Sequence, residues 1–103
     1  MARVVFTAAA DADAAFILDD LYTKAGKPTV VKYRASFKTL YEHLADFPDS
    51  GAPRPKMGSN IRIGIVFPYV VIYRHTEADG VVRVLRIVHG GRRITGKLLR
   101  GAL

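Results

Sequence analysis

The sequence predicts a single α+β domain in which an antiparallel helix hairpin packs on a small antiparallel sheet, with the element order β-α-α-β-β-β. Three observations predict this fold class. Apolar residues recur at helical spacing in the first half, β-branched and aromatic runs fill the second half, and turn-forming residues separate the segments. The chain of 103 residues has the length of one domain, so we expect residues 1–103 to form a single unit.

A strand and a helix are expected before Gly26. The short β-branched and aromatic segment Val4-Val5-Phe6 predicts the strand. An alanine-rich stretch follows, and Asp11 and Asp13 lie near its start, where carboxylates interact favourably with a helix dipole. The apolar face of this helix contains Ala14, Ile17, Leu18, Leu21 and Tyr22. Gly26 and Pro28 are suited to end this helix and to begin the next one.

A second helix is expected from about Pro28 to Ala45. Its apolar stripe contains Val30, Tyr33, Phe37, Leu40, Tyr41 and Leu44. The turn-forming segment Phe47-Pro48-Asp49-Ser50-Gly51 ends the helix. Because the link between the two helices is short, they are expected to lie antiparallel.

Three strands are expected in the second half of the chain. The segment 61–65 alternates as a half-buried strand does, and Pro68 separates it from the apolar run Tyr69–Arg74. The last strand is expected at Val81–Val88, after a turn at Asp79-Gly80. The short connections predict that these three strands form an antiparallel meander.

The composition restricts the class of protein. There is no cysteine, which excludes disulfides and thiolate metal sites and suits a reducing cytoplasm. The apolar stretches fall short of the about 20 residues that cross a bilayer, and we expect no signal peptide. The formal net charge is +7, and after Asp49 only Glu77 and Asp79 are acidic. The C-terminal half therefore predicts a surface that attracts nucleic acid, acidic proteins or anionic lipid.

Several segments carry a resemblance to a known family. They are Thr7–Asp13, Leu44–Gly51, Arg54-Pro55, Arg62, Tyr69–Arg74 and Val84–Arg93. Leu44–Gly51 is close to the pattern Leu-x-x-Phe-Pro-x-x-Gly, and Val84–Arg93 is close to a closing Ile-x-Arg-Val-x-His-x-x-Arg. In this order and spacing the segments resemble the ParE family of toxins, within the RelE/ParE superfamily of bacterial toxin–antitoxin systems. The chain departs from many relatives at Ile94-Thr95-Gly96, where those proteins have an aspartate after the arginines.

The resemblance implies a cytoplasmic toxin that is not an enzyme. Members of this family act as protein-binding inhibitors of DNA gyrase, and each is held inactive by a ParD-like antitoxin. Neither a cofactor nor a metal is expected, because no phosphate-binding glycine loop and no metal-ligand spacing is present. We expect hetero-oligomers with the antitoxin, no membrane partner, and no direct sequence-specific binding of nucleic acid.

Two sets of site residues follow from the resemblance as hypotheses. The candidate target-binding residues are His89, Arg92, Arg93, Lys97 and Arg100. The candidate antitoxin-binding residues are Ile17, Leu21, Tyr33, Phe37, Arg62, Arg74, Arg83 and Arg86. A regular last strand places Arg83 and Arg86 on opposite faces, so one of them faces the helices and requires an acidic partner. We hypothesise that the antitoxin supplies this carboxylate.

The alternative function is a ribosome-dependent messenger RNA endoribonuclease of the RelE type. RelE-like members usually have an arginine after a Gly-Tyr pair in the penultimate strand and a tyrosine or histidine near the C-terminus. Here Val70 follows Tyr69, and residues 94–103 contain neither tyrosine nor histidine. Both departures favour the binding toxin over the ribonuclease. A generic basic nucleic-acid-binding module is a third, weaker alternative.

Overall fold

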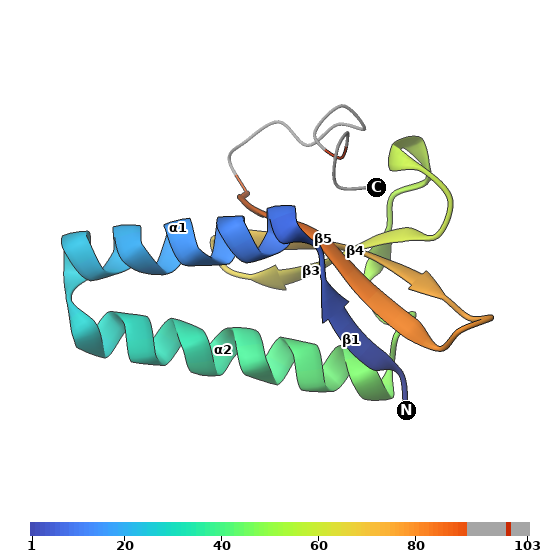
Figure 1. Cartoon of the computed structure of the whole chain (residues 1–103), viewed down its shortest axis with the longest axis horizontal. Helices are drawn as coiled ribbons and strands as arrows, with labels where there is room; N and C mark the ends of the chain where they lie inside the picture. The colour runs from blue at the N-terminus through green and yellow to red at the C-terminus, as the bar shows by residue number, and fades with distance from the viewer. Residues whose placement is uncertain (91–98, 100–103) are drawn as a thin grey trace.

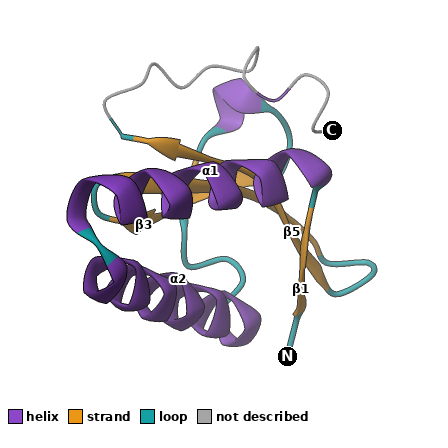
Figure 2. Cartoon of the chain, turned by 60° about the vertical axis from the view of Figure 1, so that its left-hand side comes forward, coloured by secondary structure: helices purple, strands orange, loops and turns teal. Residues whose placement is uncertain are grey.

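Two helices cover one face of a five-stranded sheet, as Figures 1 and 2 show. This computed structural model describes residues 1–90 and Leu99. The elements are β1 (Arg3–Phe6), α1 (Ala8–Ala25), α2 (Lys27–Asp46), β2 (Ala52–Pro53), the 3-10 helix η1 (Pro55–Met57), β3 (Ile61–Val66), β4 (Tyr69–Thr76) and β5 (Val81–His89). The predicted α+β class and the predicted helix hairpin are confirmed. Within the described residues, no helix is long and apolar enough to cross a membrane.

The sheet is mixed rather than purely antiparallel. Its strand order is β1-β5-β4-β3-β2, and β1 runs parallel to β5 while the other pairs are antiparallel. The first strand thus pairs with the last, after a crossover that contains both helices. Such a crossover is long enough to allow parallel pairing. The prediction of an antiparallel sheet therefore holds for the three-stranded meander and fails for β1.

The main core lies between the helices and the sheet. Its buried residues are Ala10, Ile17, Phe37, Leu44, Val66, Tyr69, Val71, Tyr73, Val82, Val84 and Ile87. Helix α2 approaches β3 closely at Gly64, where an added Cβ would lie 3.0 Å from Leu40 Cδ1. A glycine at this strand position therefore allows the helix to pack directly on the backbone.

A second core lies on the opposite face of the sheet. Its buried residues are Met57, Ile61, Ile63, Val70, Ile72, Leu85, Val88 and Leu99. Met57 comes from η1, so the loop between β2 and β3 covers this face. Because both faces are covered, β4 is buried over Tyr69–Tyr73 without alternation. This explains why the sequence shows a continuous apolar run there.

Tyr73 explains the turn motif that follows α2. Its hydroxyl donates a hydrogen bond to Pro48 O at 2.9 Å and accepts one from Gly51 N at 2.9 Å. A Cβ on Gly51 would lie 2.6 Å from Ile63 O and would also collide with the tyrosine hydroxyl. The Phe-Pro-Asp-Ser-Gly turn is therefore fixed against β3 and β4 by a buried phenol.

The first turn of α1 is fixed to β5. Thr7 caps the helix, because its Oγ1 accepts a hydrogen bond from Ala10 N at 3.0 Å. The same hydroxyl donates to Leu85 O at 2.8 Å, and Thr7 N donates to Val84 O at 3.0 Å. Strand β1 pairs with β5 only as far as Val84. The start of α1 thus continues to cover the edge of β5 where β1 ends.

A bulge at Leu85 interrupts the regular pairing of β4 with β5. Val84 pairs with Tyr73. The next pair joins Arg86 to Ile72, so Leu85 has no partner on β4. An extra residue in one strand changes which face the following side chains occupy.

This bulge places Arg83 and Arg86 on the same face of the sheet. Arg83 pairs with Arg74, two residues along β4 from Ile72, which is the partner of Arg86. Residues two apart on a strand share a face, and Ile72 belongs to the core away from the helices. The prediction that Arg83 and Arg86 lie on opposite faces is therefore wrong, because it assumed a strand without a bulge.

Candidate functional site

An apolar groove of about 600 Å³ is lined by residues of β1, α1, α2 and β5. Figure 1 shows how β1 and the two helices lie beside one another. Its lining residues are Val4, Phe6, Asp11, Ala14, Leu18, Arg34, Phe37, Lys38, Tyr41, Glu42, Ala45 and Ile87. Phe6 remains 41% exposed although its ring packs edge-to-face on Tyr41 at a centroid distance of 4.9 Å. A large apolar side chain left half-exposed in a concave site is typical of a surface that binds a partner.

The rim of this groove carries charges of both signs. Asp11 and Glu42 supply carboxylates, while Arg34 and Lys38 supply cations. Burial, together with the nearby charge of Asp11, raises the pKa of Tyr41 to about 12. The phenol therefore stays protonated at neutral pH and remains a hydrogen-bond donor at the edge of the apolar site.

The apolar candidates from the sequence are mostly core residues. Ile17 and Phe37 are only 7% and 9% exposed, and Leu21 packs against the same core. The Tyr33 ring packs edge-to-face on Tyr69 at 5.7 Å. Of these four candidates only Phe37 lines the groove. The structure therefore does not bring them together on one surface.

Arg62 has partners in the turn after α2. Its Nη1 donates to Asp49 O at 2.8 Å and to Gly51 O at 2.9 Å. The Asp49 carboxylate also lies 2.7 Å from His75 Nδ1, and the His75 side chain is 12% exposed. Arg62 and His75 thus hold the turn against the sheet, on a different surface from the groove.

Arg86 has an acidic partner within the same chain. Its Nε donates to Asp13 Oδ2 at 2.7 Å, and its Nη2 donates to Asp13 Oδ1 at 3.1 Å. Ile87 N also donates to Asp13 Oδ2 at 2.9 Å. This hydrogen bonding raises the pKa of Arg86 above its usual value. The hypothesis that Arg86 takes its carboxylate from another protein is therefore corrected, because α1 brings Asp13 to the open edge of β5.

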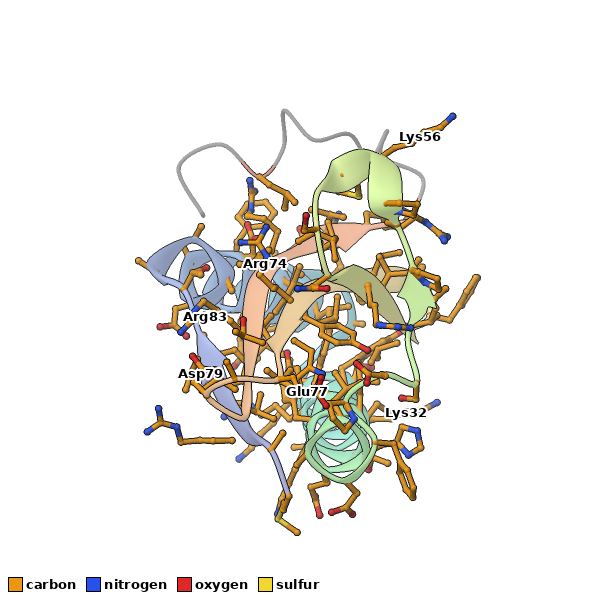
Figure 3. All side chains as sticks on the ribbon, turned by 90° about the vertical axis from the view of Figure 1, so that its right-hand side faces the viewer. Lys32, Lys56, Arg74, Glu77, Asp79 and Arg83 are labelled. Atoms are coloured by element: carbon orange, nitrogen blue, oxygen red, sulfur yellow. The ribbon has the colours of Figure 1, made fainter. Side chains whose placement is uncertain are left out.

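Arg74 and Arg83 lie on neighbouring strands, near the turn that joins them (Figure 3). Arg74 Nε donates to Ser59 O at 3.1 Å. Both side chains are half-buried and belong to the face away from the helices. The predicted cationic candidates are thus divided between two surfaces, and none of them lines the groove.

The candidate target-binding residues are described only in part. His89 is exposed at the end of β5, and its ring packs edge-to-face on Tyr69 at 6.0 Å. Burial, with smaller contributions from Tyr33 and Asp20, raises the pKa of Tyr69, which is only 8% exposed. Arg92, Arg93, Lys97 and Arg100 lie outside the described residues.

Val70 and the possible metal ligands bear on whether the described residues could carry out chemistry. Val70, which stands where RelE-like members usually have an arginine, is 6% exposed and belongs to the second core. In the described part of the chain, no three His, Asp or Glu side chains converge as metal ligands would. The buried Val70 therefore offers no exposed catalytic group.

Sequence reasoning did not identify the groove as a site. Phe6 and Leu18 were assigned to the first strand and to a helix face, and Tyr41 to the stripe of the second helix. An aromatic residue at the end of the β1 strand was the one available signal, since periodicity does not separate a core residue from a groove residue.

Comparisons with known proteins place the chain in a family. The family model described as the ParE toxin of the type II toxin–antitoxin system parDE matches residues 4–94. Toxin RelE2 of Caulobacter vibrioides is 36% identical over 93 residues, which cover 89% of this chain and 99% of that protein.

Two solved structures are similar in fold. The chromosomal ParDE system of P. aeruginosa has a TM-score of 0.69 at 22% identity, covering 86% of this chain and 96% of that chain. The toxin–antitoxin complex RelBE2 of Mycobacterium tuberculosis has a TM-score of 0.64 at 20% identity, covering 85% and 96%. With the match over residues 4–94, the chain belongs to the ParE family and is a toxin of a type II toxin–antitoxin system in the ParE/RelE superfamily.

Proposed function

We propose that this toxin inhibits DNA gyrase in the cytoplasm by binding, and that a ParD-like antitoxin neutralises it by docking in the apolar groove. The observation that carries the antitoxin site is the groove itself, which is apolar within and charged at its rim. An amphipathic helix places apolar side chains at helical spacing into such a groove and leaves its polar face to water. The solved ParDE and RelBE2 structures, which contain toxins with this fold, support a partner of this kind.

Gyrase is favoured over messenger RNA as the target. The family match is to ParE, and the position that carries an arginine in RelE-like ribonucleases is the buried Val70. The RelE-like ribonuclease is kept as the second candidate because the relative from Caulobacter vibrioides carries the name RelE2.

One pair of assays tests the target. Purified toxin is added to gyrase with relaxed plasmid, and in parallel to translating ribosomes with a defined messenger RNA. The proposal expects loss of supercoiling with accumulation of cleaved DNA, and intact messenger RNA. Cleavage of the messenger RNA with normal supercoiling would establish the ribonuclease instead. Activity in neither assay would place the target elsewhere.

A matched pair of variants tests the antitoxin site. Phe6→Ala removes a groove residue that is 41% exposed, and Phe16→Ala removes a residue on α1 that is 73% exposed and lies outside the groove. Loss of an aromatic anchor typically costs over 1 kcal/mol of binding, so Phe6→Ala should weaken the antitoxin complex about 5-fold or more. Phe16→Ala should leave it within about 2-fold. Equal effects of the two variants would reject the groove as the docking site.

A further inference from the structure

Three arginines share the face of the sheet away from the helices. Arg83 on β5 pairs directly with Arg74 on β4. Arg3 on β1 pairs with Val81, two residues before Arg83, so Arg3 occupies the same face one step along the strand. We call Arg3, Arg74 and Arg83 the arginine face. These residues occupy neighbouring positions, where Cβ atoms lie roughly 5 Å apart for a direct pair and roughly 7–8 Å apart for a diagonal one.

Direct pairing of like charges is unfavourable in a sheet unless an anion lies nearby. Arg3 N donates a backbone hydrogen bond to Gly80 O, but the side chains of Arg3 and Arg83 form no hydrogen bond or ion pair with any residue that the structure describes. Arg74 donates a hydrogen bond from Nε to Ser59 O, which leaves its two terminal nitrogens available to an anion. The arginine face therefore lacks the counter-charge that its own fold would be expected to supply.

The acids nearest in sequence are engaged elsewhere. Asp79 Oδ1 accepts a hydrogen bond from Val81 N within the turn between β4 and β5. Glu77, in the same turn, lines a cavity whose other lining residues include Asp49 and His75. Among the described residues, neither carboxylate of this turn forms an ion pair with Arg3, Arg74 or Arg83, so an external anion would add a charge-balancing contact that the turn does not supply.

The surroundings of the arginine face favour a phosphate backbone over a protein segment. Protein segments usually dock through apolar anchors in pockets. Of the apolar neighbours here, Val81, Ile61 and Leu85 are each no more than 2% exposed, and Val5, which pairs with Arg83 on β1, is half-buried, so little apolar surface is exposed on this face. Guanidinium groups are the exposed chemistry of this face, and their fork geometry fits phosphate oxygens.

The same surroundings favour a duplex over a single strand. Proteins that hold single strands stack the bases on aromatic side chains. None of the described residues that point to this face from β1, β4 and β5 is aromatic. A cationic surface without aromatic side chains can contact the phosphates of a duplex without reaching its bases.

We propose that the arginine face binds the phosphate backbone of double-stranded DNA without reading its sequence. This binding goes beyond the proposed inhibition of gyrase and does not depend on it. The proposal assigns the two faces of the toxin to different partners, because the apolar groove lies on the helix side of the sheet and the arginine face lies on the other side. A toxin seated on an antitoxin through its groove would keep the arginine face available.

The test measures fluorescence anisotropy of a labelled 20-base-pair duplex of mixed sequence with the full-length toxin between 50 and 200 mM salt, conditions in which each phosphate contact adds about 0.9 to the salt slope. The test variant is Arg3→Ala/Arg74→Ala/Arg83→Ala. The matched control is Lys24→Ala/Lys27→Ala/Lys32→Ala, which removes the same charge from exposed positions of α1 and α2 outside the groove. The test variant should bind at least about 10-fold more weakly and lose about 2–3 from the salt slope, whereas the control should change little.

Other outcomes would overturn the proposal. Equal losses in the two variants would show that only the net charge matters, and no loss in the test variant would remove the arginine face from binding. Tighter binding of a single-stranded RNA would reject the duplex. Loss of antitoxin binding with unchanged DNA binding would assign the face to an acidic protein segment. Because Arg74 contacts Ser59, the double variant Arg3→Ala/Arg83→Ala provides the same test, with a loss of about 2 in slope, if the triple variant does not fold.

Discussion

Asp13 is expected to be the most sensitive charged residue of the described fold. Its carboxylate receives two hydrogen bonds from Arg86 and one from the Ile87 amide, and it does so across the open edge of β5. The side chains of Arg86 and Asp13 are only 20% and 17% exposed. Asp13→Ala would leave a guanidinium and a backbone amide without this acceptor in a mostly dehydrated site.

The magnitude follows from that burial. Removing one partner of a fully buried ion pair costs about 3–5 kcal/mol, and an unpaired buried amide costs about 1–3 kcal/mol. Since some water reaches this pair, we expect Asp13→Ala to lower the free energy of unfolding by about 3 kcal/mol. For a domain of this size that corresponds to a fall in Tm of roughly 12–20 °C.

Urea denaturation measures this effect on the free energy of unfolding. Thermal unfolding of the same proteins gives the change in Tm. Asp20→Ala is the matched control on the same helix, because Asp20 forms an exposed pair with Lys24 at 3.1 Å. The control should cost less than about 0.5 kcal/mol. A double-mutant cycle with Arg86→Met isolates the pair and should give a coupling energy of about 2 kcal/mol. A cost of Asp13→Ala no larger than that of Asp20→Ala, or a coupling energy near zero, would refute this reasoning.

Three further predictions concern the turn after α2 and the groove. Gly51→Ala should destabilise the fold by at least about 2 kcal/mol in urea, because its Cβ would lie 2.6 Å from Ile63 O; an unchanged midpoint would contradict the close packing. Tyr73→Phe should cost about 1–3 kcal/mol, since two backbone groups lose their partner; a cost below about 0.5 kcal/mol would mean that water replaces the phenol. Tyr41 should ionise near pH 12 in a spectrophotometric titration of the folded toxin. Because unfolded tyrosine ionises near pH 10, stability should fall as the pH rises from about 10 to 12, and Tyr41→Phe should reduce that fall; an unchanged fall would contradict the role of Tyr41.

The elements that depend on local signals could be predicted from the sequence. Helix α2 was expected within one residue of its observed ends, because a regular apolar stripe and the turn at Phe47–Gly51 define it. The hairpin between β4 and β5 was expected from Asp79-Gly80, and Gly80 has the positive φ of 65° that such a turn requires. Local spacing and turn chemistry are sufficient for features of this kind.

Features that depend on distant contacts could not be predicted in the same way. The parallel pairing of β1 with β5 joins residues almost 80 positions apart, and nothing in Val4-Val5-Phe6 indicates its partner. The bulge at Leu85 has no glycine or proline to mark it, yet it places Arg86 on the same face as Arg83 instead of the opposite one. The candidate site was the feature that the sequence predicted least well, because Ile17 and Phe37 have the same helical spacing whether they face a partner or the core.

The contact between α1 and β5 connects stability with the proposed binding site. Asp13 does not line the groove, but Asp11 and Ala14 on either side of it do. Thr7 and Asp13 together fix this part of α1 along β5, where β1 no longer pairs. The position of α1 sets the distance between the two helices, and therefore the width of the groove. A variant at Asp13 that still folds should consequently weaken antitoxin binding without removing any groove residue, whereas Asp20→Ala, in the second half of the same helix, should not.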